Sequence, residues 1–162
     1  GVMQFTRLAD ELGLPRVLGT QNAYSLLNRT FETALAEVCH REQVGLLAYS
    51  ALAFGLLTGK YLADPAAPGR LTQWPGFGQR YGKPNVAPAV AAYAALAQRH
   101  GLTPTQLALG FTRSRWFVSS TIIGASSLAQ LRETLPATQT PISAELLAEI
   151  DAIHLQYTNP AP

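Results

Sequence analysis

The chain has 162 residues, of which 48% are apolar and 14% charged, a balance that fits one folded domain and argues against intrinsic disorder. Its formal net charge of +2 argues against a nucleic-acid partner. No apolar run approaches the roughly 18–20 residues that span a bilayer, and the single cysteine, Cys39, cannot form an internal disulfide. We therefore expect a soluble cytoplasmic protein without a membrane partner.

The N-terminal quarter predicts a helix, a strand and a second helix. Apolar residues recur at helical spacing over residues 2–12, and Gly13 ends that helix. β-Branched side chains favour a short strand over residues 17–22. A helix over residues 31–41 follows, with Thr30 as its expected N-cap.

Two contrasting segments follow. Residues 44–50 form a continuous apolar run, which is typical of a strand buried on both faces of a parallel sheet. Between residues 51 and 88 this pattern gives way to glycine, proline and aromatic residues. A long loop of that composition is expected to be ordered and to carry function.

The C-terminal half continues the alternation of helices and strands. Thr103 and Ser127 are expected N-caps, and Pro104 suits the first position of a helix. The predicted elements are helices over residues 89–100, 105–113, 127–135 and 143–154, and a buried strand over residues 118–123.

This alternation predicts an α/β fold of about three parallel strands with flanking helices. A sheet of that size keeps two open edges and buries few apolar neighbours. We therefore expect either that further strands come from elsewhere or that the chain associates with itself.

The glycines of the loop suggest phosphate binding. The segment from Gly55 to Lys60 resembles a P-loop, but it has one residue too few between Gly55 and Gly59, and Tyr61 stands where serine or threonine is required. A nucleoside-triphosphate cradle is therefore disfavoured. What remains is a glycine-rich loop after a strand, which suits an anionic ligand or a plain turn.

A second candidate anion site is Gly124-Ala125-Ser126-Ser127, which also follows a strand and opens a helix. Free backbone N–H groups and the helix dipole attract phosphate at such a place. Capping of the helix by Ser126 or Ser127 is the competing interpretation.

Other chemistry finds little support in the residues. His40, His100 and His154 all lie near the ends of predicted helices, where an imidazolium complements the helix dipole, and no two of them share a metal-ligand spacing. Cys39 is expected to be a packing residue. No nucleophile-elbow pattern occurs, and the sequence therefore indicates neither a metal site nor a catalytic residue.

Longer strings in the sequence are more specific than its periodicity. These strings are QNAYSLLNR at residues 21–29, LAYSAL at 47–52, GLLTGKY at 55–61, GASS at 124–127 with Gln130 after it, and EIDAIH at 149–154 running on to NPAP at 159–162. They resemble the aldo-keto reductase superfamily, in its bacterial Tas-type branch, over essentially the whole chain and in the same order.

The resemblance implies a (β/α)8 barrel (TIM barrel) that binds NADP(H) and reduces small carbonyl compounds by hydride transfer. Residues 1–162 would form the C-terminal part of that single barrel domain, partnered by the missing N-terminal half or by a second copy. The family's catalytic Asp, Tyr, Lys and His come from the missing strands, so no catalytic residue is assigned here. The alternative is a non-catalytic partial barrel that binds a nucleotide or a protein.

The resemblance also implies cofactor-binding residues. Gln21 would hydrogen-bond the nicotinamide carboxamide, and Tyr49 would stack on its ring, although Tyr49 could equally be a core residue. The remaining expected contacts are Ser50, Ala51 and Leu52 to the pyrophosphate, Lys60 and Arg70 as charges over the loop, and Gly124, Ser126, Gln130 and Glu133 around the 2′-phosphate and adenine. Lys60 and Arg70 could also be solvated surface charges.

Three positions depart from the family pattern. Ala51 replaces the usual proline, Phe54 a small residue and Thr134 an asparagine that reaches the adenine. The first loosens the entry of the loop, the second crowds the pyrophosphate path, and the third removes a hydrogen bond.

Overall fold

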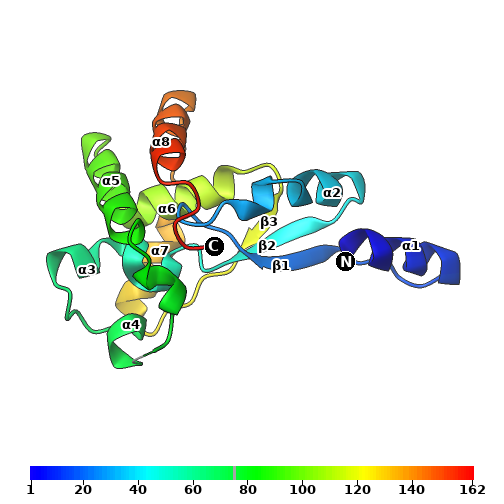
Figure 1. Ribbon diagram of the computed structural model, residues 1–162, viewed down its shortest axis with the longest axis horizontal. Helices are drawn as coiled ribbons and strands as arrows, with labels where there is room; N and C mark the ends of the chain where they lie inside the picture. Colours follow the sequence, from blue (N-terminus) through cyan, green and yellow to red (C-terminus); the bar gives the residue numbers. More distant parts are fainter. Residues whose placement is uncertain (75) are drawn as a thin grey trace.

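The computed structural model describes residues 1–74 and 76–162. Within them the strands β1 (Gly19–Ala23), β2 (Gly45–Tyr49) and β3 (Val118–Thr121) form a parallel sheet in the order β1-β2-β3 (Figure 1). This arrangement confirms the predicted α/β fold with its parallel strands and flanking helices, and it fits part of a larger barrel. None of the described helices is long and apolar enough to cross a membrane.

Helices connect the strands and pack beside them. The longer ones are α1 (Val2–Leu12), α2 (Leu35–Arg41), α5 (Val86–Arg99), α6 (Pro104–Ser114), α7 (Leu128–Ala137) and α8 (Ala144–Gln156). Shorter turns are η1 (Thr30–Glu32), η2 (Ala53–Thr58), α3 (Lys60–Ala63), α4 (Arg70–Gln73) and η3 (Gln79–Gly82). The predicted caps Thr103 and Ser127 each accept a hydrogen bond from a backbone N–H of the first turn, and Ser143 caps α8 in the same way.

The expected helix over residues 31–41 is wrong in its first turn. Thr30 does not cap it, because its hydroxyl donates to Asn28 Oδ1 at 2.7 Å. The chain forms the 3₁₀ turn η1 instead, and Ala34 adopts a φ of 66° before α2 begins at Leu35.

The expected long loop over residues 51–88 contains short helical turns that the sequence did not indicate. It contains the short turns η2, α3, α4 and η3, and α5 already begins at Val86. Pro88 therefore lies in the first turn of α5, where a residue without an N–H loses no helical hydrogen bond.

One face of the sheet is covered by helices. α2 packs against β2 and α6 against β3, with α5 and α8 beyond α6 (Figure 1). Leu46 and Ala48 of β2 point to that face and are fully buried. Leu47 and Tyr49 point to the opposite face and are only half-buried, so the prediction that β2 is buried on both faces is wrong.

The third strand is not buried either. Ser119 and Ser120 are exposed, because β3 is an edge of the described sheet and carries polar residues that helices do not cover. The β-branched run that suggested a buried strand ends in Ile122 and Ile123, which lie beyond β3.

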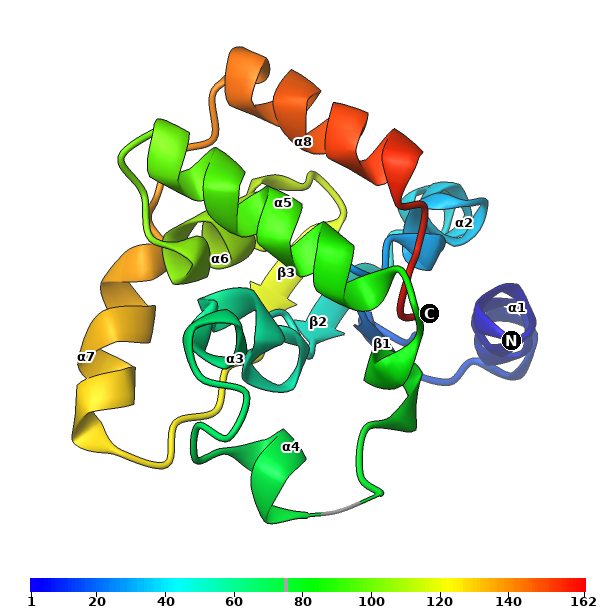
Figure 2. The ribbon, with the colours of Figure 1, turned by 60° about the vertical axis from the view of Figure 1, so that its left-hand side comes forward.

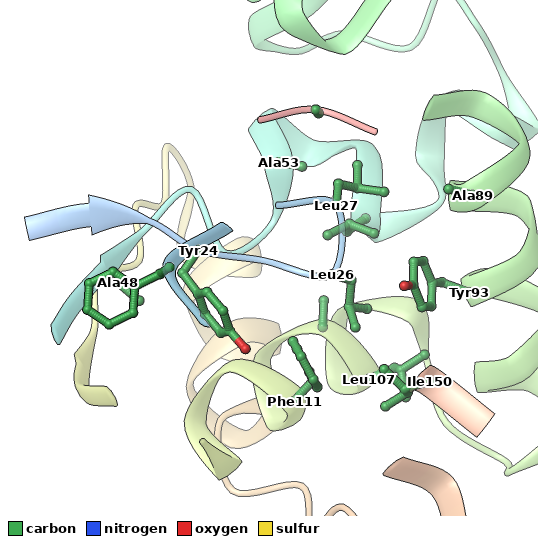
Figure 3. Close-up of a cluster of buried hydrophobic side chains, with 14 of the residues drawn as sticks. Tyr24, Leu26, Leu27, Ala48, Ala53, Ala89, Tyr93, Leu107, Phe111 and Ile150 are labelled. Atoms are coloured by element: carbon green, nitrogen blue, oxygen red, sulfur yellow. The ribbon is translucent and has the colours of Figure 1, made fainter. Parts of the chain in front are cut away.

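The hydrophobic core lies between the covered face and the helices. Tyr24 stacks on Phe111 with ring centroids 5.8 Å apart and meets Phe117 edge-on at 5.2 Å. Around them lie buried aliphatic residues of several elements, among them Leu26, Leu27, Leu107 and Ile150 (Figure 3). Cys39 is buried among these residues, as predicted.

A buried arginine ties the loop after β1 to the last helix. Arg29 is 7% exposed and donates to Glu32 at 2.8 Å and to Asp151 of α8 at 2.7 Å. The backbone N–H of Arg29 also donates to Asn159 Oδ1 at 2.6 Å. We call Arg29, Glu32, Asp151 and Asn159 the Arg29 clamp.

Candidate functional site

The parallel strands all end at one edge of the sheet, and the loops that carry most of the predicted site residues follow these strand ends. Figure 2 shows α3 and α4 on the side toward which the strand arrows point. β1 pairs with β2, and this register places Gln21 beside Leu47 and Ala23 beside Tyr49. Residues paired in this way point to the same face, so Gln21 and Tyr49 share the uncovered face. Gln21 is exposed and Tyr49 half-buried.

The chain turns sharply after β2. Ser50, Ala53 and Phe54 have φ values of 57°, 47° and 58°, in a region that residues other than glycine rarely adopt. Such outliers cluster at functional sites. The turn is closed by a hydrogen bond of 2.8 Å from the Ala53 N–H to the Ser50 carbonyl oxygen.

The loops after β2 and β3 lie against each other. Ala51 is buried with Leu109 and Ala137, and Leu52 and Ile123 pack against this group. The Ile122 N–H donates to the Ala48 carbonyl oxygen at 2.7 Å. The first residues of the two loops, which lead into the two segments that the sequence singled out as anion sites, are therefore neighbours in space.

The two expected cations differ in their surroundings. Lys60 Nζ donates to the Pro68 carbonyl oxygen at 2.9 Å and lies 4.7 Å from the centre of the Tyr61 ring. Lys60 thus fastens the loop to itself. Arg70 is exposed, and its guanidinium carbon lies 5.0 Å from the centre of the Phe54 ring.

Aromatic side chains cover this loop. Phe54 and Phe77 stack with centroids 5.0 Å apart and an interplanar angle of 5°, and Tyr81 meets Phe54 edge-on at 5.1 Å. We call Phe54, Phe77 and Tyr81 the aromatic cap. Burial raises the pKa of Tyr81 above its ordinary value.

The segment after β3 is held by its own hydrogen bonds. Gln130 Oε1 accepts from the Ser126 N–H at 2.8 Å and from the Ser126 hydroxyl at 3.1 Å, and Ser127 caps α7. Nothing lies within 4 Å of the place where a Cβ on Gly124 would stand. Capping is therefore present, and the cofactor role of Gly124, Ser126 and Gln130 stays a prediction.

Glu133 has a partner that the sequence did not reveal. Thr105 at the start of α6 donates its hydroxyl to Glu133 Oε1 at 2.8 Å, which fixes the carboxylate between α6 and α7. No signal in the sequence pairs these residues, because the contact depends on the packing of two helices that are separate along the chain.

The histidines have structural surroundings. His40 packs edge-on against Trp116 at 5.1 Å, and His100 Nε2 lies 2.6 Å from Glu149 Oε1. Burial, followed by the nearby Arg29 guanidinium, lowers the pKa of His154. Among residues 1–74 and 76–162 no group of three or more His, Cys, Asp and Glu side chains could hold a metal ion.

The strands, the crossover helices and the loops at the carboxyl edge fit one family. The family model for the aldo/keto reductase family matches residues 4–155. The chain belongs to that family.

Aldo/keto reductases and related proteins from several organisms are similar to this chain. It is 51% identical to "Protein tas" of Escherichia coli (strain K12), over 100% of this chain and 47% of tas. It is 35% identical to an aldo-keto reductase of Babesia bovis, over 99% of this chain and 59% of that protein. It is 33% identical to L-glyceraldehyde 3-phosphate reductase of Escherichia coli O157:H7, over 91% of this chain and 44% of that reductase. The chain thus spans about half the length of these aldo/keto reductase relatives.

Proposed function

We propose that this chain is the cofactor-binding, C-terminal part of an NADP(H)-dependent reductase that converts aldehydes or ketones to alcohols. One observation carries the proposal: Gln21 and Tyr49 share the uncovered sheet face, next to the loops after β2 and β3. Membership of the aldo/keto reductase family supports the oxidoreductase chemistry. The buried, unpaired Cys39 supports a reducing, cytoplasmic setting.

The residues present suit a nicotinamide dinucleotide. The amide of Gln21 can both donate to and accept from a carboxamide, and the Tyr49 ring can pack on a flat heterocycle. Arg70 and the N-terminus of α7, a helix of 10 residues, suit phosphate groups. When bound, the dinucleotide supplies the hydride.

Each residue of the chain would act by holding and orienting. Gln21 and Tyr49 would fix which side of the nicotinamide faces the substrate. The backbone of Ser50, Ala51 and Leu52 would line the pyrophosphate path, with Arg70 over it. Gly124, Ser126, Gln130 and Glu133 would surround the adenosine end, and Lys60 would keep the loop in shape through the Pro68 carbonyl group.

We place the catalytic groups and the remaining strands in a segment encoded ahead of Gly1. The chain spans 47% of its E. coli relative, and β1 and β3 are the edges of the described sheet, where further strands can pair. Reading the coding sequence upstream tests this directly. An upstream half-barrel with an Asp, Tyr, Lys and His set is expected, and a start codon at this point would contradict it.

The activity test uses that full-length protein with NADPH and a panel of aldehydes and ketones. NADPH oxidation that depends on the carbonyl compound is expected, with no turnover by residues 1–162 alone. Binding of NADPH without any turnover by the full-length protein would instead favour the non-catalytic module.

A further inference from the structure

Phe54 lies at the centre of the loop after β2. Its ring contacts the Arg70 guanidinium at 5.0 Å, Phe77 at 5.0 Å and Tyr81 at 5.1 Å. These contacts come from three separate turns of the chain, so the Phe54 ring holds three parts of the loop together.

The backbone around Phe54 is shaped for this contact. Phe54 has a φ of 58°, a conformation that a bulky L-residue adopts only when its surroundings compensate. On the other side, a Cβ on Gly78 would come within 2.7 Å of Leu71 Cδ2 and 3.2 Å of Phe54 Cδ2. Glycine at position 78, with a φ of 82°, lets the chain lie directly against the Phe54 ring.

Arg70 depends on this ring for its position. Within the described parts of the chain, the ion pairs within 4.0 Å involve Arg7, Arg16, Arg29, Arg41, Arg99, His100 and Arg115, and not Arg70. A guanidinium stacked on an aromatic face keeps its N–H edges free, and those edges can grip a phosphate with two parallel hydrogen bonds.

We propose that Phe54 is a positioning residue for anion recognition: its ring holds the Arg70 guanidinium over the loop after β2, ready for a phosphate of the cofactor. The inference rests on the proposed function for the identity of that phosphate. The family resemblance leads one to expect a small residue at this position, where this chain has phenylalanine.

A merely structural role of Phe54 would look different. If Phe54 were only a core residue, replacing it would weaken cofactor binding by loosening the whole loop. The loss of affinity would then be the same whichever residue stands at position 70. A positioning residue acts through Arg70, so removing Arg70 first makes the loss of Phe54 nearly silent.

The test is a double-mutant cycle in the full-length protein, with NADPH titrated into Phe54→Leu, Arg70→Ala and the double variant. Leucine keeps an apolar side chain and removes the aromatic face. Phe54→Leu should weaken NADPH binding about twofold to fivefold, the range of an exposed cation–π contact. In the Arg70→Ala background the same substitution should change binding by less than about 1.5-fold.

Phe54→Tyr is the matched control, because it keeps the aromatic face and should bind NADPH like the wild type. A loss of equal size with and without Arg70 would overturn the inference and leave the proposed function standing. Wild-type protein that does not bind NADPH at all would instead overturn the proposed function.

A second measurement tests the contact between Phe54 and Arg70 even if the wild-type protein does not bind NADPH. A proton held over an aromatic ring has its NMR signal moved upfield, so the Arg70 Hδ signal should lie upfield in the wild type and in Phe54→Tyr. It should return toward its ordinary position in Phe54→Leu. An Arg70 signal that is the same in all three proteins would refute the positioning role without any ligand.

Discussion

Arg29 Nη1 and Asp151 Oδ1 lie 2.7 Å apart although the two residues are 122 positions apart in the sequence. This contact joins the loop that follows β1 to α8. β1 carries Gln21, so the Arg29 clamp holds the loop that follows the strand of the proposed nicotinamide contact.

Replacing Arg29 should destabilise the fold strongly. Arg29→Met keeps the length of the side chain but leaves Glu32 half-buried without its main positive partner. Breaking such a pair costs about 3–5 kcal/mol. Urea unfolding followed by circular dichroism measures the loss.

The matched control for Arg29 is Arg41, whose ion pair with Glu37 lies on an exposed helix face at 2.7 Å. Arg41→Met should cost at most about 0.5 kcal/mol. Equal losses at the two positions would show that burial of the Arg29 clamp adds nothing to stability.

Stability should fall in acid, beginning with His154. Burial and then the Arg29 guanidinium lower the pKa of His154, and Glu32 and Asp151 on η1 and α8 oppose this effect. The unfolded chain therefore takes up this proton first, and stability declines as the pH falls below about 6.5, the ordinary pKa of histidine.

Glu32 adds a second decline at lower pH. Burial opposes its ionisation, but the hydrogen bonds from Arg29 and Tyr24 lower its pKa below 4.5, so the stabilisation is lost as the pH falls through the folded-state value.

Unfolding midpoints between pH 7 and 5 should fall less in His154→Leu than in the wild type. The exposed histidine His40, changed to Gln, serves as control, and an unchanged slope in His154→Leu would refute the assignment.

Gly45 is required by the close approach of β3. A Cβ on Gly45 would come within 2.8 Å of Ser119 Cβ, closer than the two strands allow. Gly45→Ala should therefore destabilise the sheet by about 1–3 kcal/mol, and Ser119→Gly should restore much of the loss. Thermal unfolding checks both.

Gly124→Ala is the control for Gly45, because nothing lies near its Cβ position. It should leave the unfolding temperature unchanged. If Ser119→Gly does not rescue Gly45→Ala, the clash with the Ser119 side chain is not the cause of the lost stability.

Periodicity and caps predicted most of the fold. Thr103 and Ser127 cap the helices that the sequence assigned to them. The errors arise where tertiary contacts decide. Thr30 bonds Asn28 instead of capping, and Leu47 and Tyr49 belong to an apolar run whose second face helices do not cover.

The site was predictable in part. Because parallel strands end at one edge, the sequence could bring Gln21, Tyr49 and Gly124 to the same end of the sheet. It could not reveal that Lys60 is engaged with Pro68, because that bond forms only when the loop closes on itself. Nor could it reveal the stacking of Arg70 on Phe54, which depends on φ values that no motif encodes.

In the proposed function, the uncovered face of β1 and β2 holds the nicotinamide end of the cofactor. The most direct test is the dissociation constant of NADPH for the full-length protein and for Gln21→Leu, with Thr20→Val as control. Thr20 pairs with Leu46 and so points to the opposite, covered face of the same strand. Loss of the amide should weaken NADPH binding about threefold to tenfold, as for a lost hydrogen bond, with Thr20→Val within about 1.5-fold of the wild type, the scatter expected of a residue outside the site. Equal dissociation constants for Gln21→Leu and the wild type would contradict the account.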